Sequence, residues 1–166
     1  YNVAVPQSPL KLNEKHSLFK LFMGDTGLLC ASCMENVQFS ILNGDLEINM
    51  GSILENAMAQ QLQSNGLELY YYDSSKLGEV DFVVQSGTGV ELLEIKSGKN
   101  YRKHKALNNI LNVSEWKFKK ATVLCKDNIQ AESDIIYLPW YMIIFIKPSQ
   151  LPKKMIYEVD LDSLYL

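Results

Sequence analysis

The sequence predicts an α/β domain in which a mixed β-sheet is flanked by helices, and three stretches carry that prediction. Residues 51–64 have apolar side chains at helical spacing. Two apolar runs flank Gly87-Thr88-Gly89, as in a β-hairpin. A second helical pattern at 103–113 is followed by two further apolar runs. Helices and strands in this order favour a mixed sheet with helices on its faces.

The individual elements follow from local patterns. Ser52 and Glu55 have the spacing of a capping box at the start of the first long helix, and Asn65-Gly66 ends it with a pair suited to positive φ. In chain order, we expect a short helix at 26–33 capped by Asp25, a helix at 51–64, strands at 67–72, 80–85 and 89–95, a helix at 103–113, strands at 121–125 and 135–138, and a short helix at 139–145.

The two ends of the chain carry weaker patterns. Residues 1–16 are polar and contain prolines, so we expect a linker or an edge segment from an upstream region. Residues 17–23 are expected to form a strand. The globular domain then covers residues 17–146. Residues 147–166 form a Pro- and Lys-rich extension, expected to add an edge strand at 155–161.

Composition bounds the class of protein. The chain has 166 residues, of which 47% are hydrophobic and 21% charged, and this suits one globular domain with a sizeable core. A net charge of -3 gives no global attraction to nucleic acid or anionic membranes, so nucleic-acid contact requires a local patch. The longest apolar run, 135–146, is shorter than the ~18 residues of a spanning helix. No secretory signal is visible and the first residue is Tyr1, so we expect an excised piece of a cytoplasmic protein with no membrane partner.

The cysteines give no sign of a disulfide framework or a metal site. Three are present, which is a low and odd number that fits a reducing compartment. Cys30 and Cys33 form a lone C-x-x-C motif, and His16 and His104 are isolated in the sequence. In a short apolar helix, we expect these two cysteines to be small, buried hydrophobic side chains.

Asp81 and the Glu94-Ile95-Lys96 stretch carry the strongest chemical signal. Side chains alternate along a strand, so Glu94 and Lys96 point to the same side, and a hairpin can place Asp81 across from Glu94. Two carboxylates can hold Mg²⁺, and an adjacent lysine can orient a metal-bound water or neutralise a phosphate. Glu94 lies in a run predicted to be buried on both faces, where a charge is costly without a partner or a metal.

Each of these residues also has a purely structural interpretation. An ion pair of Lys96 with Glu94 or Asp81 needs no catalysis to explain it. Glu55 is either part of the helix cap or a third carboxylate directed toward the sheet edge. Glu79 shares the face of Asp81 if the strand begins early, but a surface position is the expectation.

A basic run follows directly after Lys96 and is the one local patch that could meet phosphates. We expect it at the start of a helix, whose N-terminal dipole also favours phosphate, although a solvated loop is the alternative. Its members are Lys99, Arg102, Lys103 and Lys105. The chain has no P-loop motif and no set of residues suggesting a Ser-His-Asp triad.

Five stretches in a fixed order resemble the C-terminal uncharacterised domain of bacterial and archaeal AAA-type ATPases, whose core is similar to the PD-(D/E)xK restriction-endonuclease fold. They cover roughly residues 17–145. The stretches are F-K-L-F-M-G-D-T-G-L-L (19–29), G-S-I-L-E-N-A-M-A-Q-Q-L (51–62), L-Y-Y-Y (69–72), G-E-V-D-F-V-V (78–84) and E-I-K-S-G-K-N (94–100).

The resemblance implies a restriction-endonuclease-like mixed sheet and an upstream AAA-type ATPase module, outside this chain, that would bind ATP. It also implies the residue roles of a Mg²⁺-dependent nuclease. Asp81 and Glu94 take the two acidic, metal-binding positions, Lys96 takes the lysine position, and Glu55 takes the helix carboxylate. Val80 stands where the motif has proline. The alternative is a catalytically inactive module that binds partners or assembles the ATPase, because fold does not dictate function.

Overall fold

The structure is a computed structural model, and it describes residues 1–33, 39, 43 and 50–149. Its strands are β1 (Asn2–Val3), β2 (Glu14–Lys15), β3 (Tyr70–Ser74), β4 (Gly78–Ser86), β5 (Gly89–Ile95), β6 (Lys120–Cys125), β7 (Gln130–Glu132) and β8 (Ile135–Pro139). Its α-helices are α1 (Thr26–Cys33), α3 (Gly51–Ser64) and α4 (Lys105–Leu111), and its 3-10 helices are η1 (Leu10–Asn13) and η2 (Trp140–Phe145).

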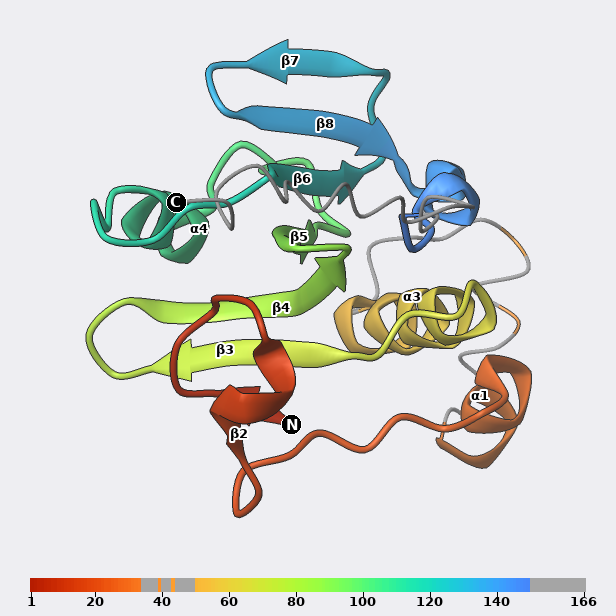
Figure 1. Cartoon of the computed structure of the whole chain (residues 1–166). Coiled ribbons are helices and arrows are strands. Elements are labelled where there is room, and N and C mark those ends of the chain that lie inside the picture. The colour runs from red at the N-terminus through yellow and green to blue at the C-terminus, as the bar shows by residue number, and fades with distance from the viewer. Residues whose placement is uncertain (34–38, 40–42, 44–49, 150–166) are drawn as a thin grey trace, which may run out of the picture.

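The strands form one mixed sheet of eight, in the order β2-β1-β3-β4-β5-β6-β8-β7 (Figure 1). Strands β3, β4 and β5 pair antiparallel, whereas β5, β6 and β8 run parallel. Parallel neighbours need a crossover connection, and the chain between β5 and β6 contains α4. The predicted α/β class, a mixed sheet with helices on its faces, is confirmed.

The sheet has a hydrophobic core on each face, because its central strands place apolar side chains on both sides. One core forms where Leu107 and Ile110 of α4 pack on the sheet. The other forms where Met58, Ala59 and Leu62 of α3 pack on the opposite face. Burial of both faces explains why β4 and β5 have nearly continuous apolar sequences.

The predicted capping box of α3 is wrong, although the helix has the predicted bounds. The cap position is Met50, and no side chain caps the helix. Ser52 therefore lies inside the first turn, and Glu55 lies beyond the position from which a side chain can reach back to the cap. The carboxylate of Glu55 instead pairs with Lys20. In α1, by contrast, the Asp25 carboxylate accepts the Leu28 N–H at 2.9 Å, as predicted.

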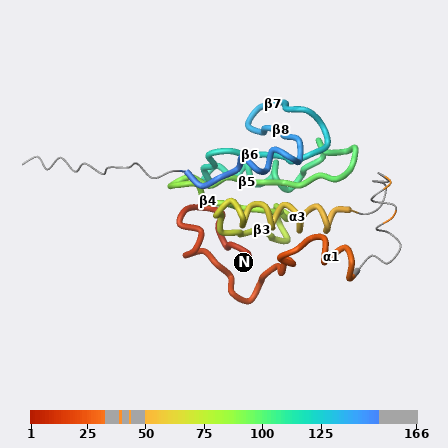
Figure 2. Tube along the Cα trace, turned by 90° about the vertical axis from the view of Figure 1, so that its right-hand side faces the viewer, coloured from red at the N-terminus to blue at the C-terminus, as the bar shows by residue number. Residues whose placement is uncertain are grey.

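The N-terminal segment lies along the sheet and α3. Residues 1–16 contain β1 and β2, and β1 extends the sheet beside β3. The strand predicted at 17–23 is absent, because side chains of α3 satisfy the backbone there: Asn56 accepts the Met23 N–H at 2.8 Å and donates to the Met23 carbonyl at 3.0 Å. Figure 2 shows α1 next to α3 at the end of this segment.

Some predictions lie outside the described residues, including the edge strand at 155–161 and the side chain of Cys33. Cys30 and Cys125 are free thiols, and Cys30 is only partly buried, so the predicted full burial is wrong for this residue. Within the described part of the chain, no helix combines the length and the apolar character needed to cross a membrane.

Candidate metal centre at the start of strand β4

A β-bulge sets the direction of the Asp81 side chain. Strand β3 pairs Tyr70 with Val83 but Tyr72 with Val80, so two residues of β4, Asp81 and Phe82, oppose a single residue of β3. Phe82 packs in the α3-side core. A bulge of this kind re-aims a side chain, and here the Asp81 carboxylate lies close to that of Glu55 on α3.

Three carboxylates from two elements converge at this bulge. Glu55 comes from α3, and Glu79 and Asp81 come from the start of β4. One oxygen of each lies within 4.8 Å of the others, which is close enough for a shared cation. A cavity of about 50 Å³ borders Asp81 and Lys20, with aromatic and aliphatic side chains around it, and neither Glu55 nor Glu79 lines it.

Lys20 places an ammonium group among these carboxylates. Its Nζ lies 2.7 Å from an oxygen of Glu55 and also contacts the carboxylate of Glu79. Its ammonium also stands over the Tyr71 ring, 5.0 Å from the centroid. Burial lowers the pKa of Lys20, but the hydrogen bonds to the two glutamates outweigh that effect and hold its pKa above the ordinary value.

The electrostatics of Asp81 are those of a partly buried acid among like charges. Burial raises the pKa of Asp81 to about 7, and the charge of Glu94 adds to the effect. The Ile95 N–H donates to Asp81 Oδ2 at 2.7 Å and opposes this shift, because it favours the ionised form. Asp81 thus takes the place of a backbone acceptor between β4 and β5.

Glu94 and Lys96 form an ion pair beside Asp81. Lys96 Nζ lies 2.6 Å from Glu94 Oε1, and the Glu94 side chain is only 7% exposed. Its other oxygen, Oε2, is buried and has no hydrogen-bond partner among the described residues. An unpaired buried carboxylate oxygen is costly, so Glu94 retains capacity for a further ligand. Lys96 is itself anchored, since its carbonyl accepts the Trp140 indole N–H at 3.1 Å.

The structure therefore brings together only part of the predicted set. Asp81 lies near Glu55, and the charge of Glu94 acts on Asp81. The cluster of three carboxylates, however, contains Glu79 and not Glu94. The position of Glu79 could have been predicted, because Glu79 and Asp81 are two residues apart on one strand. Lys20 gave none, because it lies 35 residues before Glu55 and meets it only through the fold.

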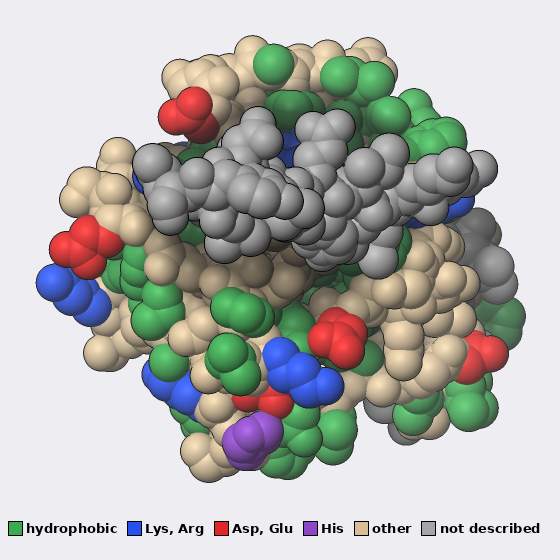
Figure 3. Space-filling view, in the orientation of Figure 1, with side chains coloured by type: hydrophobic (Ala, Val, Ile, Leu, Met, Phe, Trp, Pro, Cys, Tyr) green, Lys and Arg blue, Asp and Glu red, His purple; other side chains and the backbone are tan. Residues whose placement is uncertain are grey.

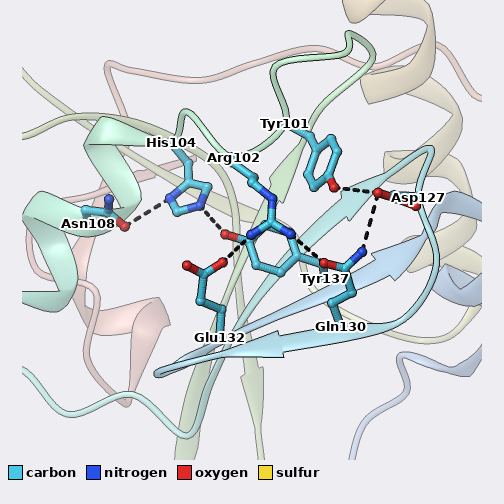
Figure 4. Close-up of polar contacts among 8 residues, drawn as sticks. All are labelled: Tyr101, Arg102, His104, Asn108, Asp127, Gln130, Glu132 and Tyr137. Carbon is cyan, nitrogen blue, oxygen red and sulfur yellow. Dashed lines mark hydrogen bonds and ion pairs between the residues drawn. The ribbon is translucent and has the colours of Figure 1, made fainter.

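Part of the predicted phosphate patch is occupied by contacts within the protein (Figure 4). Arg102 pairs with Glu132 and Gln130 of β7, and its guanidinium stacks on Tyr137. Helix α4 begins at Lys105, two residues later than predicted, so Lys103 lies before the helix and not at its start. The buried His104 links this group to the sheet through the Tyr137 hydroxyl at 2.7 Å.

The remaining members of the patch, Lys99, Lys103 and Lys105, are exposed to solvent. On the face that Figure 3 shows, the lysine and arginine side chains of the described residues stand apart from one another. A second cavity, of about 430 Å³, borders Gly66 and Gly87, and none of the carboxylates of the metal centre lines it.

A family model matches residues 50–143 of this chain, which is more than half of its length. It describes a domain of unknown function, DUF4143. The chain belongs to the DUF4143 family. This uncharacterised family is commonly found with AAA ATPases. No curated protein and no solved structure gave a significant match. The DUF4143 match contains Glu55, Glu79, Asp81 and Glu94, whereas Lys20 precedes it.

Proposed function

We propose that this chain is a nuclease-like domain that binds Mg²⁺ at the start of β4 and hydrolyses phosphodiester bonds in nucleic acid, in a protein whose upstream part is an AAA-type ATPase. The observation that carries the proposal is the convergence of Glu55, Glu79 and Asp81 beside the Glu94–Lys96 pair. The cluster offers only carboxylate oxygens, which suit Mg²⁺.

Each residue has a distinct part in this proposal. Glu55, Glu79 and Asp81 would hold the cation, and the charge of Glu94, which acts on Asp81, would add to the negative potential there. A bound Mg²⁺ supplies a Lewis acid at the phosphate and makes water a better nucleophile. Lys96 uses one of its three donors on Glu94 and is 28% exposed, so its other donors can orient a water or a phosphate oxygen.

Lys96→Ala tests the catalytic part of the proposal. We expect the variant to retain Mn²⁺ binding and to lose metal-dependent cleavage by about 10²-fold or more, because its proposed contact is made in the transition state. Mn²⁺ binding is measured by calorimetry, and cleavage is followed on plasmid DNA, single-stranded DNA and RNA. Lys119→Ala is the matched control, since that lysine also lies near a glutamate, Glu91 at 3.4 Å, but away from the cluster. Equal cleavage by both variants would contradict the role of Lys96.

The basic residues should contribute unequally to nucleic-acid binding. Replacing both Lys103 and Lys105 by Ala is expected to shallow the log–log salt dependence of binding by about two units, as for two lost phosphate contacts. Arg102→Ala should change the slope by less than one unit, because its guanidinium already binds Glu132 and Gln130. Fluorescence anisotropy over a range of salt concentrations measures the slopes. A larger loss with Arg102→Ala would show that the guanidinium leaves Glu132 to bind phosphate.

A non-catalytic module that binds a partner of the ATPase is the second candidate, and one observation favours it. The N-terminal segment exposes a run of apolar side chains, with Leu18 at 47%, Phe19 at 56% and Leu21 at 86% exposed. Exposed apolar patches often mark interaction sites. Cleavage lost in Lys96→Ala supports the nuclease. Metal binding without cleavage of any substrate, in the isolated domain and with the ATPase restored, supports the module.

A further inference from the structure

Lys20 lies inside the carboxylate cluster that is proposed to bind the metal. Its ammonium contacts Glu55 and Glu79, two of the three carboxylates proposed to hold Mg²⁺, and its charge also acts on the third, Asp81. Its side chain is 24% exposed, so it is held in the cluster rather than extended into solvent. The cluster is therefore partly neutralised by the protein itself.

The segment that contains Lys20 binds α3 at every third residue, at positions 20, 23 and 26. Lys20 binds Glu55, Met23 binds Asn56 through both of its backbone groups, and the N–H and hydroxyl of Thr26 bind the Gln60 side chain at 3.1 and 2.9 Å. These three residues, three apart, follow one helix. Movement of Lys20 would therefore strain the Met23 contacts, which are the next attachment along the segment.

A divalent cation and the Lys20 ammonium compete for the same oxygens. Both need the carboxylates of Glu55 and Glu79, and two cations a few ångströms apart repel each other strongly where water is partly excluded. Two observations point to a ligand besides the lysine. A cavity of about 50 Å³ adjoins both Lys20 and Asp81, and Glu94, whose charge acts on Asp81, has a buried oxygen with no hydrogen-bond partner in the described part of the chain.

We infer that Lys20 is an internal counter-ion of the metal centre, and that a divalent cation binds to Glu55, Glu79 and Asp81 as the Lys20 side chain leaves the cluster and loosens residues 17–25 from α3. This inference rests on the proposed metal site and adds a regulator to it. Metal binding and the release of the N-terminal segment are then coupled. The cation favours release by the same factor by which release raises the affinity for the cation.

Lys20→Met tests the inference directly, because it removes the charge but keeps the length and apolar stem of the side chain. At pH 8, we expect this variant to bind Mn²⁺ at least about tenfold more tightly than the wild type in calorimetric titration. Lys15→Met is the matched control: it makes the same change of net charge at an exposed lysine of β2 and should leave the Mn²⁺ affinity within about twofold.

A second measurement follows the N-terminal segment itself, in the wild type and then in Lys20→Met. Amide hydrogen exchange of residues 17–25 in the wild type should accelerate when Mn²⁺ is added, because the segment loosens as Lys20 leaves. In Lys20→Met, where the lysine is already gone, Mn²⁺ should change the exchange of this segment little.

The outcomes separate the inference from the metal site itself. Equal Mn²⁺ affinity in wild type and Lys20→Met, with no change in exchange of residues 17–25, overturns the counter-ion role and leaves the metal site standing. No Mn²⁺ binding to either protein overturns the metal site and the inference together. Tighter binding by Lys20→Met alone, with metal-dependent exchange in the wild type, supports both.

Discussion

Asp81→Asn is expected to make the metal-free protein more stable at pH 8 and to reduce its affinity for Mn²⁺ by about 10²-fold or more. The substitution removes a buried charge, so the folded state no longer carries the cost of its desolvation or its repulsion from Glu94 and Glu55. The amide oxygen of Asn can still accept the Ile95 N–H that Asp81 binds at 2.7 Å. We expect a gain of about 2 kcal/mol in the free energy of unfolding, because functional sites commonly store such strain.

The stability of the wild type should depend on pH through the ionisation of Asp81. The pKa of Asp81 is raised to about 7 in the folded protein from the ordinary value of 3.8. Between these values the folded state binds more protons than the unfolded state, so wild-type stability falls as pH rises from about 4 to about 7. The full shift would correspond to about 4 kcal/mol, and partial exposure of the group reduces it to roughly half. In Asp81→Asn, this part of the slope should disappear.

Urea denaturation in EDTA at a series of pH values measures the effect. Asp81→Ala is the control, because it removes the charge and also the acceptor of the Ile95 N–H, and an unpaired buried N–H costs about 1–3 kcal/mol. Alanine should therefore be less stable than asparagine at pH 8. The same pH slope in wild type and Asp81→Asn would show that Asp81 ionises normally in the folded protein.

Gly78→Ala is expected to destabilise the protein by about 3 kcal/mol. Gly78 begins β4 with a φ of +94°, and a Cβ there would lie 2.9 Å from the Cβ of Ala106 in α4. An L side chain at positive φ costs about 1–2 kcal/mol, and overpacking against a helix adds about 1–3 kcal/mol. Because Glu79 follows directly, a shifted start of β4 should also weaken Mn²⁺ binding.

Gly66→Ala is the matched control for backbone strain alone. Gly66 has a φ of +86°, but among the described residues a Cβ there would meet only Pro148, at 3.9 Å. It should cost about 1–2 kcal/mol, and the difference from Gly78→Ala measures the overlap with α4. Adding Ala106→Gly to Gly78→Ala should recover that difference, less the ~1 kcal/mol that glycine costs inside a helix. Equal losses for the two alanine variants, by urea denaturation, would show that α4 moves aside freely.

The elements that the sequence located well are those whose local pattern matches their environment. The helix Gly51–Ser64 and the strand Gly89–Ile95 have the predicted bounds, since the apolar stripe and the turn residues mark their limits. Strand β7 was missed, because three residues with no buried side chain carry no periodic signal. The strand expected at 17–23 was wrong, and at its end Asn56, distant in sequence, binds both backbone groups of Met23.

Some features of the candidate site could likewise be predicted from local sequence, and others could not. The hairpin turn and the alternation of β5 placed Asp81 near the Glu94–Lys96 pair, and their charges do interact in the structure. The bulge was not foreseeable, since it depends on how β3 pairs with β4, and it is the bulge that turns Asp81 toward Glu55. The apparent capping role of Glu55 hid its contact with Lys20.

The sequence by itself determined the α/β class, the hairpin and the acidic and basic residues at the ends of its strands, because these depend on periodicity and turn chemistry within a few residues. Only the tertiary structure decided which charges meet. Helix α3 packs against the start of β4, so Glu55 joins Glu79 and Asp81, and the N-terminal segment runs along α3, so Lys20 enters the cluster. Charges attract or repel through space, and the chain order of these residues does not reveal the distances between them.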